Sequence, residues 1–566
     1  MASTTPQRLD AEIIILGGGP VGLATAADLA WRGLRPLLVE RGDGEVKHPR
    51  AGGFTARTME HLRRWGVADE ARKYFNPDFP LNQRFCLSVS GYELATARMG
   101  TLRETPTPPE TPEKHQRCRQ MYYDPIIRDR AIELGAEIRL GHQVESFEDR
   151  GDHVECGVLN VETQDRSTLR CRYLVACDGG RSWVREQLGI DVTGNRLNHS
   201  LSVLLEGDVL KYGGEEPAER FIILGPNGPW ANITTMEGRN ERWRMNLRYN
   251  EEPDLETFDP QEAIRRAIHP DAELKVLSIL PWRRSNIIAD RFRVGNVLLA
   301  GDAVHVMTPT GGFGANTGIG DAVDLAWKLQ AMVEGWGGDA LVDSYELERR
   351  PIAFRNVYEA ERNHHAWTPG EDASRIAEDS PEAEQIRRRI GNALVEASYP
   401  EWNSIGVALG YAYLNSPLCV PDGTPPPPDE PSVYFPTARP GHRAPHAWLT
   451  DGRSTLDLFG KGFVLLRFGD ADEAGVEMLR AAAVDRGMPL AVELIDDPQI
   501  AELYEQPLVL VRPDGHVAWR AAAVPDAGDL LDIVRGATVR PQLRAGVEAA
   551  TFHAQVQQRE LADTLA

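Results

Sequence analysis

The sequence predicts a mixed α/β protein, α+β overall, that is divided into several domains. Its 566 residues are too many for one hydrophobic core and indicate about two to four domains. At three places an apolar, strand-like run leads into a glycine-rich turn and then into a helix-like segment, which is the order of elements in a parallel sheet. A proline-rich stretch near residue 425 separates these segments from a further set of strand candidates.

Composition excludes several classes of protein. Hydrophobic residues make up 42% and aromatic residues 7% of the chain, as in ordinary globular proteins. A net charge of −22 argues against a nucleic-acid partner, which would require a concentrated basic face. The six cysteines are scattered without a CxxC pair, so neither a disulfide framework nor a metal site is expected. No apolar run is long enough to cross a membrane, and we expect a cytoplasmic protein.

The first motif lies at residues 11–40 and predicts a dinucleotide site. A buried-type strand ends at a G-x-G-x-x-G turn formed by Gly17, Gly19 and Gly22, and a helical segment and a second strand follow. Gly17 allows the sharp turn, Gly19 lets a pyrophosphate approach the backbone, and Gly22 lets helix and strand pack closely. Glu40 ends the second strand, where its carboxylate can accept hydrogen bonds from a ribose. This segment alone is compatible with either NAD or FAD.

Two further motifs repeat the pattern of a strand followed by an acid and glycines. Residues 173–177 lead into Asp178 and two glycines. Residues 293–299 lead to Asp302, which is followed by Pro309 and a loop with four glycines in eight residues. Such a high density of glycine indicates tight turns or a close approach of another molecule to the backbone.

These three motifs, in this order, resemble the FAD-dependent aromatic hydroxylases, the single-component class A flavoprotein monooxygenases. The resemblance covers about residues 11–370, and the remainder is similar to the C-terminal extension of phenol-hydroxylase and polyketide-hydroxylase members. It implies a Rossmann-like FAD-binding domain, a mixed-sheet substrate domain, a helical segment, a Pro-rich linker and a thioredoxin-like domain that lacks CxxC. The expected bounds are, in that order, 1–190 with 286–370, 191–285, 371–420, 421–435, and 436–566.

The resemblance also implies which residues hold FAD. Asp302 would bind a ribityl hydroxyl, Pro309 would keep its loop rigid, and a helix beginning near Asn316 or Thr317 would point its positive end at the flavin. Arg50 would contact the pyrophosphate or receive the nicotinamide cofactor, and Gln120 would contact a ribose. The full expected set is Gly17, Gly19, Pro20, Val21, Gly22, Glu40, Arg41, Arg50, Arg119, Gln120, Val144, Asp178, Asp302, Pro309, Gly312, Gly314, Ala315 and Asn316.

The activity implied is hydroxylation of a phenolic or polycyclic aromatic substrate. NADPH or NADH would reduce FAD transiently, and O2 would give a flavin C4a-hydroperoxide that attacks the ring. Three alternatives keep the fold but change the outcome: Baeyer–Villiger insertion, epoxidation and oxidative dechlorination. A non-catalytic flavin-binding protein is the alternative from another class. The partners expected are a small aromatic substrate and O2, with no nucleic acid and no membrane span, and a homodimer is expected from the resemblance only.

Residues for the substrate are less well indicated. Short alternating runs within 195–285 predict antiparallel strands over a ligand, with Arg244, Asn246 and Trp282 as pocket candidates. The catalytic base stays unassigned, because some phenol hydroxylases have an Asp where this chain has Gly52. Arg57 and Glu60 are interpreted as a pair on a helix surface, without a functional role.

Overall fold

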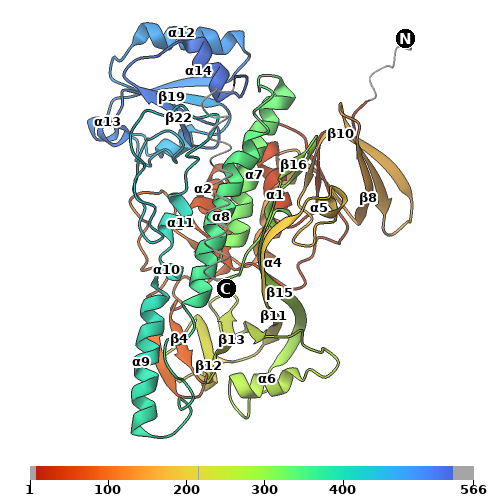
Figure 1. Ribbon diagram of the computed structural model, residues 1–566, viewed down its shortest axis with the longest axis vertical. Helices are drawn as coiled ribbons and strands as arrows, with labels where there is room; N and C mark the ends of the chain where they lie inside the picture. The colour runs from red at the N-terminus through yellow and green to blue at the C-terminus, as the bar shows by residue number, and fades with distance from the viewer. Residues whose placement is uncertain (1–7, 215, 539–566) are drawn as a thin grey trace.

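The computed structural model describes residues 8–538 except residue 215. Figure 1 shows two large sheets and a smaller one arranged around a central bundle of helices, with the chain's last described domain at one end and β4, β12 and β13 at the other. The parts of the expected domains that fall at residues 1–7, 215 and 539–566 lie outside the described residues.

The first large sheet has the strand order β16-β17-β10-β1-β2-β7, with β8 and β9 added antiparallel beside β10. β1 pairs in parallel with both β2 and β10, and its residues Ile13–Ile15 are completely buried, as the continuous apolar run predicts. The strands are β1 (Ala11–Leu16), β2 (Leu37–Glu40), β7 (Glu137–Leu140), β8 (His142–Asp149), β9 (Val154–Asn160), β10 (Arg166–Ala176), β16 (Arg293–Val294) and β17 (Val297–Leu299).

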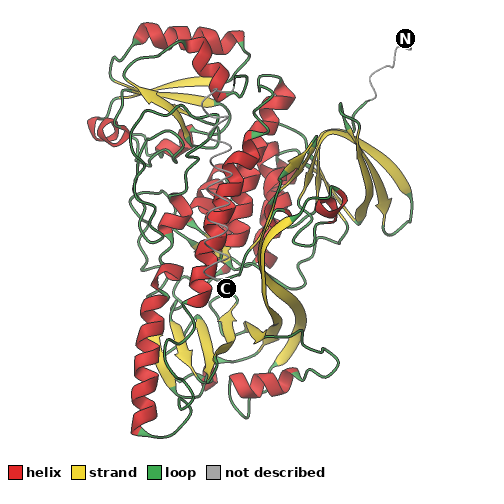
Figure 2. Ribbon diagram, viewed as in Figure 1, coloured by secondary structure: helices red, strands yellow, loops and turns green. Residues whose placement is uncertain are grey.

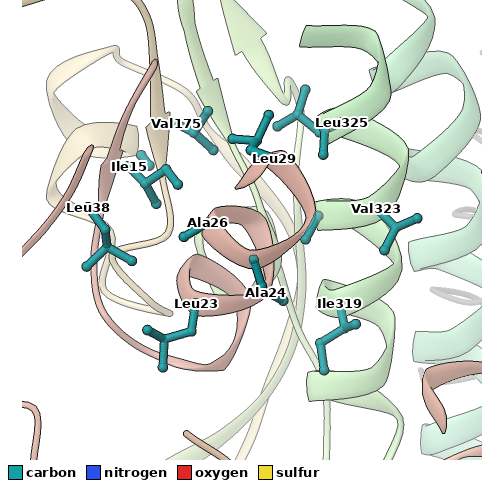
Figure 3. Close-up of a cluster of buried hydrophobic side chains, with 14 of the residues drawn as sticks. Ile15, Leu23, Ala24, Ala26, Leu29, Leu38, Val175, Ile319, Val323 and Leu325 are labelled. Atoms are coloured by element: carbon teal, nitrogen blue, oxygen red, sulfur yellow. The ribbon is translucent and has the colours of Figure 1, made fainter. Parts of the chain in front are cut away.

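Helix α1 (Pro20–Trp31) is buried between this sheet and the long helix α7 (Phe313–Glu334). Figure 3 shows Leu23, Ala26 and Leu29 of α1 between strand residues such as Ile15 and helix residues such as Ile319. Small alanines on α1 allow the two helices to pack closely. The remaining helices around this sheet are α2 (Ala56–Trp65), α3 (Ala68–Ala71), α4 (Gln120–Glu133), α5 (Trp183–Gln187) and α8 (Ser344–His365).

The second large sheet has the order β18-β15-β11-β14-β13-β12-β4-β5 and is mostly antiparallel. One face packs an apolar core against α6 (Pro260–Ala267). The other face carries polar side chains where β14 faces the first domain, and a second apolar cluster where β4 and β12 lie. The hairpin β4–β5, which lies within the stretch predicted for the FAD domain, belongs to this sheet, and α9 (Pro381–Ala397) packs near it. The strands are β4 (Gln83–Cys86), β5 (Glu93–Ala97), β11 (Val192–Glu206), β12 (Arg220–Gly225), β13 (Gly228–Thr235), β14 (Arg242–Tyr249), β15 (Lys275–Ala289) and β18 (His305–Val306).

Short elements connect the two large sheets to the last domain. A two-stranded pairing joins β3 (Gly53–Phe54) to β6 (Gln116–Arg117), and α10 (Tyr399–Trp402) and α11 (Ile405–Leu409) follow α9. Residues 421–435 form no helix or strand, in keeping with their prolines.

The last domain contains a four-stranded sheet of order β20-β19-β21-β22 with helices on its faces, seen at the top of Figure 2. β19 and β20 are parallel, whereas β21 and β22 form the antiparallel hairpin that the "RPDG" turn predicts, with Gly515 at φ +86°. This is the thioredoxin-like arrangement, and its described part contains no cysteine, since Cys419 is the last one in the chain. Its elements are β19 (Phe463–Phe468), α12 (Glu473–Asp485), β20 (Leu490–Ile495), α13 (Pro498–Tyr504), β21 (Leu508–Val511), β22 (Val517–Ala521) and α14 (Ala527–Val534).

The interpretation of Arg57 and Glu60 as a surface pair is wrong. Both are buried, and Glu60 accepts hydrogen bonds from Arg57 (2.9 Å) and from Arg443 (Nε, 3.1 Å). Arg57 also donates to the carbonyl oxygen of Asp514 in the last domain. Burial alone would raise the pKa of Glu60, but Arg443 and Arg57 outweigh it and hold the pKa at about 2. The pair therefore joins the first domain to the last.

Candidate active site

The three motif loops converge on one cavity of about 1020 Å³ between the two large sheets. Val21, directly before the first motif's last glycine, packs against the third motif, because a Cβ at Gly301 would lie 2.6 Å from its Cγ2 atom. A Cβ at Gly318, one turn into α7, would meet the same methyl group at 2.5 Å. Close packing of β1, α1 and α7 thus brings segments about 280 residues apart in the chain to one wall.

The glycines of the first motif differ in what surrounds them. Gly17 has φ +107°, and a Cβ there would lie 2.5 Å from the carbonyl oxygen of Cys177. A Cβ at Gly22 would overlap the carbonyl oxygen of Gly17. Gly19, the N-cap of α1, has no atom within 4 Å of such a Cβ, and it lines the cavity. Gly17 and Gly22 are required by the fold itself, whereas Gly19 leaves open space in front of the helix N-terminus.

Glu40 lies at the end of β2 and lines the same part of the cavity. Its carboxylate accepts hydrogen bonds from the backbone N–H groups of Gly18 (2.6 Å) and Gly42 (2.7 Å). These bonds fix its orientation, and each oxygen retains a further lone pair for a hydroxyl group.

The second motif mainly holds neighbouring segments of the chain in place and contributes less to the cavity wall. Asp178 accepts a hydrogen bond from the N–H group of Val184 in the first turn of α5, whose N-cap is Ser182. The Oδ1 atom of Asp178 is buried without a partner among the described residues. Arg185 donates to the carbonyl oxygens of Gly180 and Ala303 and so joins the second motif to the third. Gly179 lines the cavity, whereas Asp178 does not.

In the third motif, Asp302 is exposed and its side chain lines the cavity. Partial removal of the carboxylate from water raises its pKa, against the opposing effect of His305 and Arg50. The expectation that the helix begins near Asn316 or Thr317 is wrong: α7 begins at Phe313, because Gly312 in the left-handed region (φ +70°) is its N-cap. Its first N–H groups, which lack intrahelical partners, lie at the cavity wall.

Asn316, in the first turns of α7, fixes the loop that precedes α2. Its Oδ1 atom accepts from the N–H group of Thr55 (3.0 Å) and the hydroxyl of Thr58 (2.6 Å), and its Nδ2 atom donates to the carbonyl oxygen of Gly53. On the other side of this loop, the N–H group of Arg50 donates to the side chain of Gln120 (2.9 Å). The loop carrying Arg50 is therefore held between α4 and α7.

The side chain of Arg119 is nearly buried, and its guanidinium group donates hydrogen bonds to backbone carbonyl oxygens. It donates to Gly52 (2.8 Å), Thr235 (2.6 Å) and Met236 (2.8 Å), while Glu219 lies 3.5 Å away. Burial of this cation lowers its pKa to about 10, so it is still charged at neutral pH. Arg119 thus connects the cofactor-side loop to the substrate sheet.

Two titratable groups in the cavity have shifted pKa values that the sequence did not reveal. Burial raises the pKa of Asp124 to about 7, opposed by its hydrogen bond with Gln120. Burial, with Arg244 and Arg50 nearby, lowers the pKa of His48 to about 4, so this imidazole is neutral at pH 7. Its Nδ1 atom lies 2.8 Å from the hydroxyl of Ser278 on β15.

All three substrate candidates lie on the polar face of the second sheet, although only Arg244 lines the cavity. Asn246 follows two residues later on the same face of β14 and donates to Asn232 (3.2 Å). Trp282 lies on β15, opposite Ser200 of β11, and its ring faces the guanidinium of Arg284. Gln83, Glu219, Arg220, Thr234 and Leu280 line the cavity too, and strand alternation could have found them once the face was known.

Most of the expected cofactor residues are brought together, but not all. The cavity wall includes Gly19, Pro20, Val21, Glu40, Arg50, Arg119, Gln120, Asp302, Pro309, Gly312, Gly314, Ala315 and Asn316. Gly17 and Gly22 lie immediately behind it. Arg41 is exposed outside the cavity, and the side chain of Val144 is buried in the core beside β9.

These features fit a bound FAD. The cavity is long enough to pass from the N-terminus of α1 to that of α7, and space remains in front of Gly19 where a diphosphate needs it. Glu40 and Asp302 present carboxylates along this path, where hydroxyl groups would find acceptors.

Comparison with known proteins decides the family. The model of the FAD binding domain matches residues 10–360, and that of the aromatic-ring hydroxylase C-terminal domain matches residues 437–541. The chain belongs to the FAD-dependent aromatic hydroxylases. It is 33% identical over 553 residues to tetracenomycin B2 monooxygenase-dioxygenase of Streptomyces olivaceus, covering 92% of this chain and 96% of that one.

Solved structures of this hydroxylase family agree. The rebeccamycin biosynthetic enzyme RebC with reduced flavin superposes with a TM-score of 0.87 at 39% identity, covering 94% of this hydroxylase and 99% of RebC. A ternary complex of aklavinone-11 hydroxylase with FAD and aklavinone gives a TM-score of 0.79 at 31% identity, covering 94% and 100%. The expected fold class, the FAD cofactor and the monooxygenase class are thereby confirmed. Within the described residues, no helix is long and apolar enough to span a membrane.

Proposed function

We propose that this hydroxylase inserts one oxygen atom of O2 into a phenolic or polycyclic aromatic ring, with NADPH or NADH as reductant, in the cavity between the two large sheets. The convergence of the three motif loops on that cavity carries the proposal. The second oxygen atom of O2 is released as water, and the nicotinamide cofactor supplies the two electrons that this reduction requires. When bound, FAD supplies the redox chemistry that couples these steps.

The chain's own residues have separate tasks in this proposal. The N-terminus of α1, with Gly19 open in front of it, receives the diphosphate, and Glu40 accepts a ribose hydroxyl. Asp302 bonds the ribityl chain. The N-terminus of α7 and the loop from Pro309 present N–H groups toward the reacting ring system, where a positive helix end stabilises negative charge by roughly 0.3–2 kcal/mol.

The polar face of the second sheet orients the aromatic substrate, and the bound substrate displaces water from the reacting part of the cavity. The alternative outcomes, Baeyer–Villiger insertion, epoxidation and oxidative dechlorination, use the same site with another substrate. The six free cysteines suit a reducing compartment, and we propose the cytoplasm. The homodimer stays a prediction.

The test uses the purified chain with Asp302→Ala and, as matched control, the exposed Asp152→Ala. The native protein should show oxidised-flavin absorbance and oxidise NAD(P)H faster with an aromatic substrate, forming hydroxylated product in step with NAD(P)H consumed. Asp302→Ala should lower FAD affinity at least tenfold, and Asp152→Ala should not change it. A folded native protein that takes up no FAD contradicts the proposal, and FAD uptake without any substrate-stimulated turnover supports the non-catalytic alternative.

A further inference from the structure

Arg244 lines the cavity, and no carboxylate among the residues that the structure describes forms an ion pair with it. Its Nη1 atom donates to the carbonyl oxygens of Pro49 (3.3 Å) and Arg50 (3.1 Å). Its Nε atom is buried without a partner, and no described residue accepts a hydrogen bond from its Nη2 atom. Burial, with Arg119 and Arg220 nearby, lowers its pKa to about 9, which leaves it charged at neutral pH.

Its basic neighbours in the cavity differ in this respect. Arg220 forms an ion pair with Glu401 (3.0 Å), and Arg117 pairs with Glu219 (2.8 Å), with Arg119 farther from the same carboxylate. The sheet side of the cavity thus presents four arginines against two glutamates. The uncompensated charge falls on Arg244.

The same sheet face carries more positive charge beyond the cavity. Arg248 lies over the ring of Trp367 and Arg284 over that of Trp282, and neither has an ion pair with a described residue. Burial lowers the pKa of both guanidinium groups, to about 10 and about 9. An excess of buried positive charge is costly unless an anion arrives to neutralise it, which marks this face as a place for an anionic ligand.

We propose that the aromatic substrate of this hydroxylase carries a carboxylate group and that Arg244 binds it. A guanidinium with free Nε and Nη2 donors matches the two oxygens of a carboxylate. Apolar lining residues such as Leu280 and Met307 can cover the aromatic framework beside it. This inference rests on the proposed function, since it concerns the substrate of that same site.

The experiment measures binding by calorimetry to the FAD-loaded protein at pH 7.5. The two probes are 3-hydroxy-2-naphthoic acid and its uncharged amide, which have the same ring system and hydroxyl group. The native protein should bind the acid at least tenfold more tightly than the amide, as a charge-assisted hydrogen bond in a cavity allows. Arg244→Met should abolish the preference, and Arg244→Lys should keep part of it.

Arg242→Met is the matched control. Arg242 lies two residues earlier on β14, is ion-paired with Glu237 (2.7 Å) and does not line the cavity, so its loss should leave the preference intact. Failure of the native protein to bind the acid more tightly than the amide overturns the proposal, and so does absence of binding by both probes. If Arg244→Met weakens FAD binding and keeps the acid-to-amide ratio, the anion at Arg244 is a cofactor phosphate and the proposal is wrong.

Failure of this inference is separable from failure of the proposed function. A protein that binds FAD and hydroxylates uncharged aromatic compounds, without discriminating for the acid, retains the proposed function and loses the carboxylate site. A protein that binds no FAD loses the proposed function first.

Discussion

The Nη1 atom of Arg119 lies 2.8 Å from the carbonyl oxygen of Gly52, and a Cβ at Gly52 would lie 2.5 Å from that same nitrogen. The absence of a side chain at residue 52 and the position of Arg119 therefore depend on each other. An aspartate at this position, as in some phenol hydroxylases, cannot be accommodated unless the guanidinium moves and gives up carbonyl partners in β13 and beyond it.

Gly52→Asp should therefore lower stability instead of supplying a base. We expect a loss of about 1–3 kcal/mol in the free energy of unfolding, because buried carbonyls would lose their donor. Gly52→Ala should show most of this loss, since the clash comes from Cβ. Chemical denaturation of both variants tests this, and an aspartate variant that is as stable as the native protein and more active would contradict it.

Gly19 and Gly22 should give opposite results when each is replaced by alanine. A Cβ at Gly22 overlaps the carbonyl oxygen of Gly17, so Gly22→Ala should lower the free energy of unfolding of the FAD-free protein by about 1–3 kcal/mol or more. A Cβ at Gly19 meets nothing, so Gly19→Ala should keep the melting temperature of the FAD-free protein but weaken FAD binding at least tenfold. Equal FAD affinity in Gly19→Ala and the native protein would show that the diphosphate does not approach this residue.

The contrast between these two glycines shows how far sequence reasoning reaches. The motif turns could be predicted because each depends on a strand, a turn and a helix that are consecutive in the chain. The start of α7 cannot be predicted in this way, because in a run of glycines only the φ of +70° at Gly312 shows where the helix begins. The burial of Arg57 and Glu60 is not visible in the sequence for a different reason. Arg443, the residue that completes their cluster, is 383 positions from Glu60 in sequence, and only the i,i+3 pair is visible along the chain.

Only part of the substrate face can be predicted from the sequence, for a similar reason. The alternation along β14 identifies Arg244 and Asn246 as residues of this face. Glu219 and Arg220 reach the cavity from another strand region, and no local sequence pattern shows how that region is aligned with β14. His48 lies in a loop, and its contact with Ser278 joins segments 230 residues apart.

Glu60→Gln should destabilise the protein strongly at pH 7, by about 3–5 kcal/mol, because it leaves Arg57 and Arg443 buried without their carboxylate. The folded-state pKa of Glu60, about 2, is below the unfolded value of about 4.5, so its contribution is fully present above pH 4.5 and is lost as the pH falls toward 2. Urea denaturation at pH 7, 5, 4 and 3 should show the difference between native and variant shrinking below pH 4.5. Glu145→Gln, which removes the exposed pair with Arg166, should change stability by no more than about 0.5 kcal/mol, and a constant difference for Glu60→Gln at all four pH values would refute the linkage.

Arg512 joins the thioredoxin-like domain to the middle of α7. It donates to Glu348 (2.9 Å) and Asp514 (2.7 Å), and Lys328 of α7 donates to the same glutamate (2.6 Å), all fully buried. Arg512→Met should cost about 3–5 kcal/mol, since the carboxylates of Glu348, Asp514 and Asp324 all lose a buried partner. Lys328 is 15 residues from the start of α7, about 22 Å along the helix, so FAD affinity of the folded variant should stay within about twofold of native. Thermal unfolding and FAD titration together test this. An unchanged melting temperature would contradict the predicted loss of stability. A loss of FAD affinity as large as that of Gly19→Ala would show that the cluster acts on the cofactor site and not on domain attachment alone.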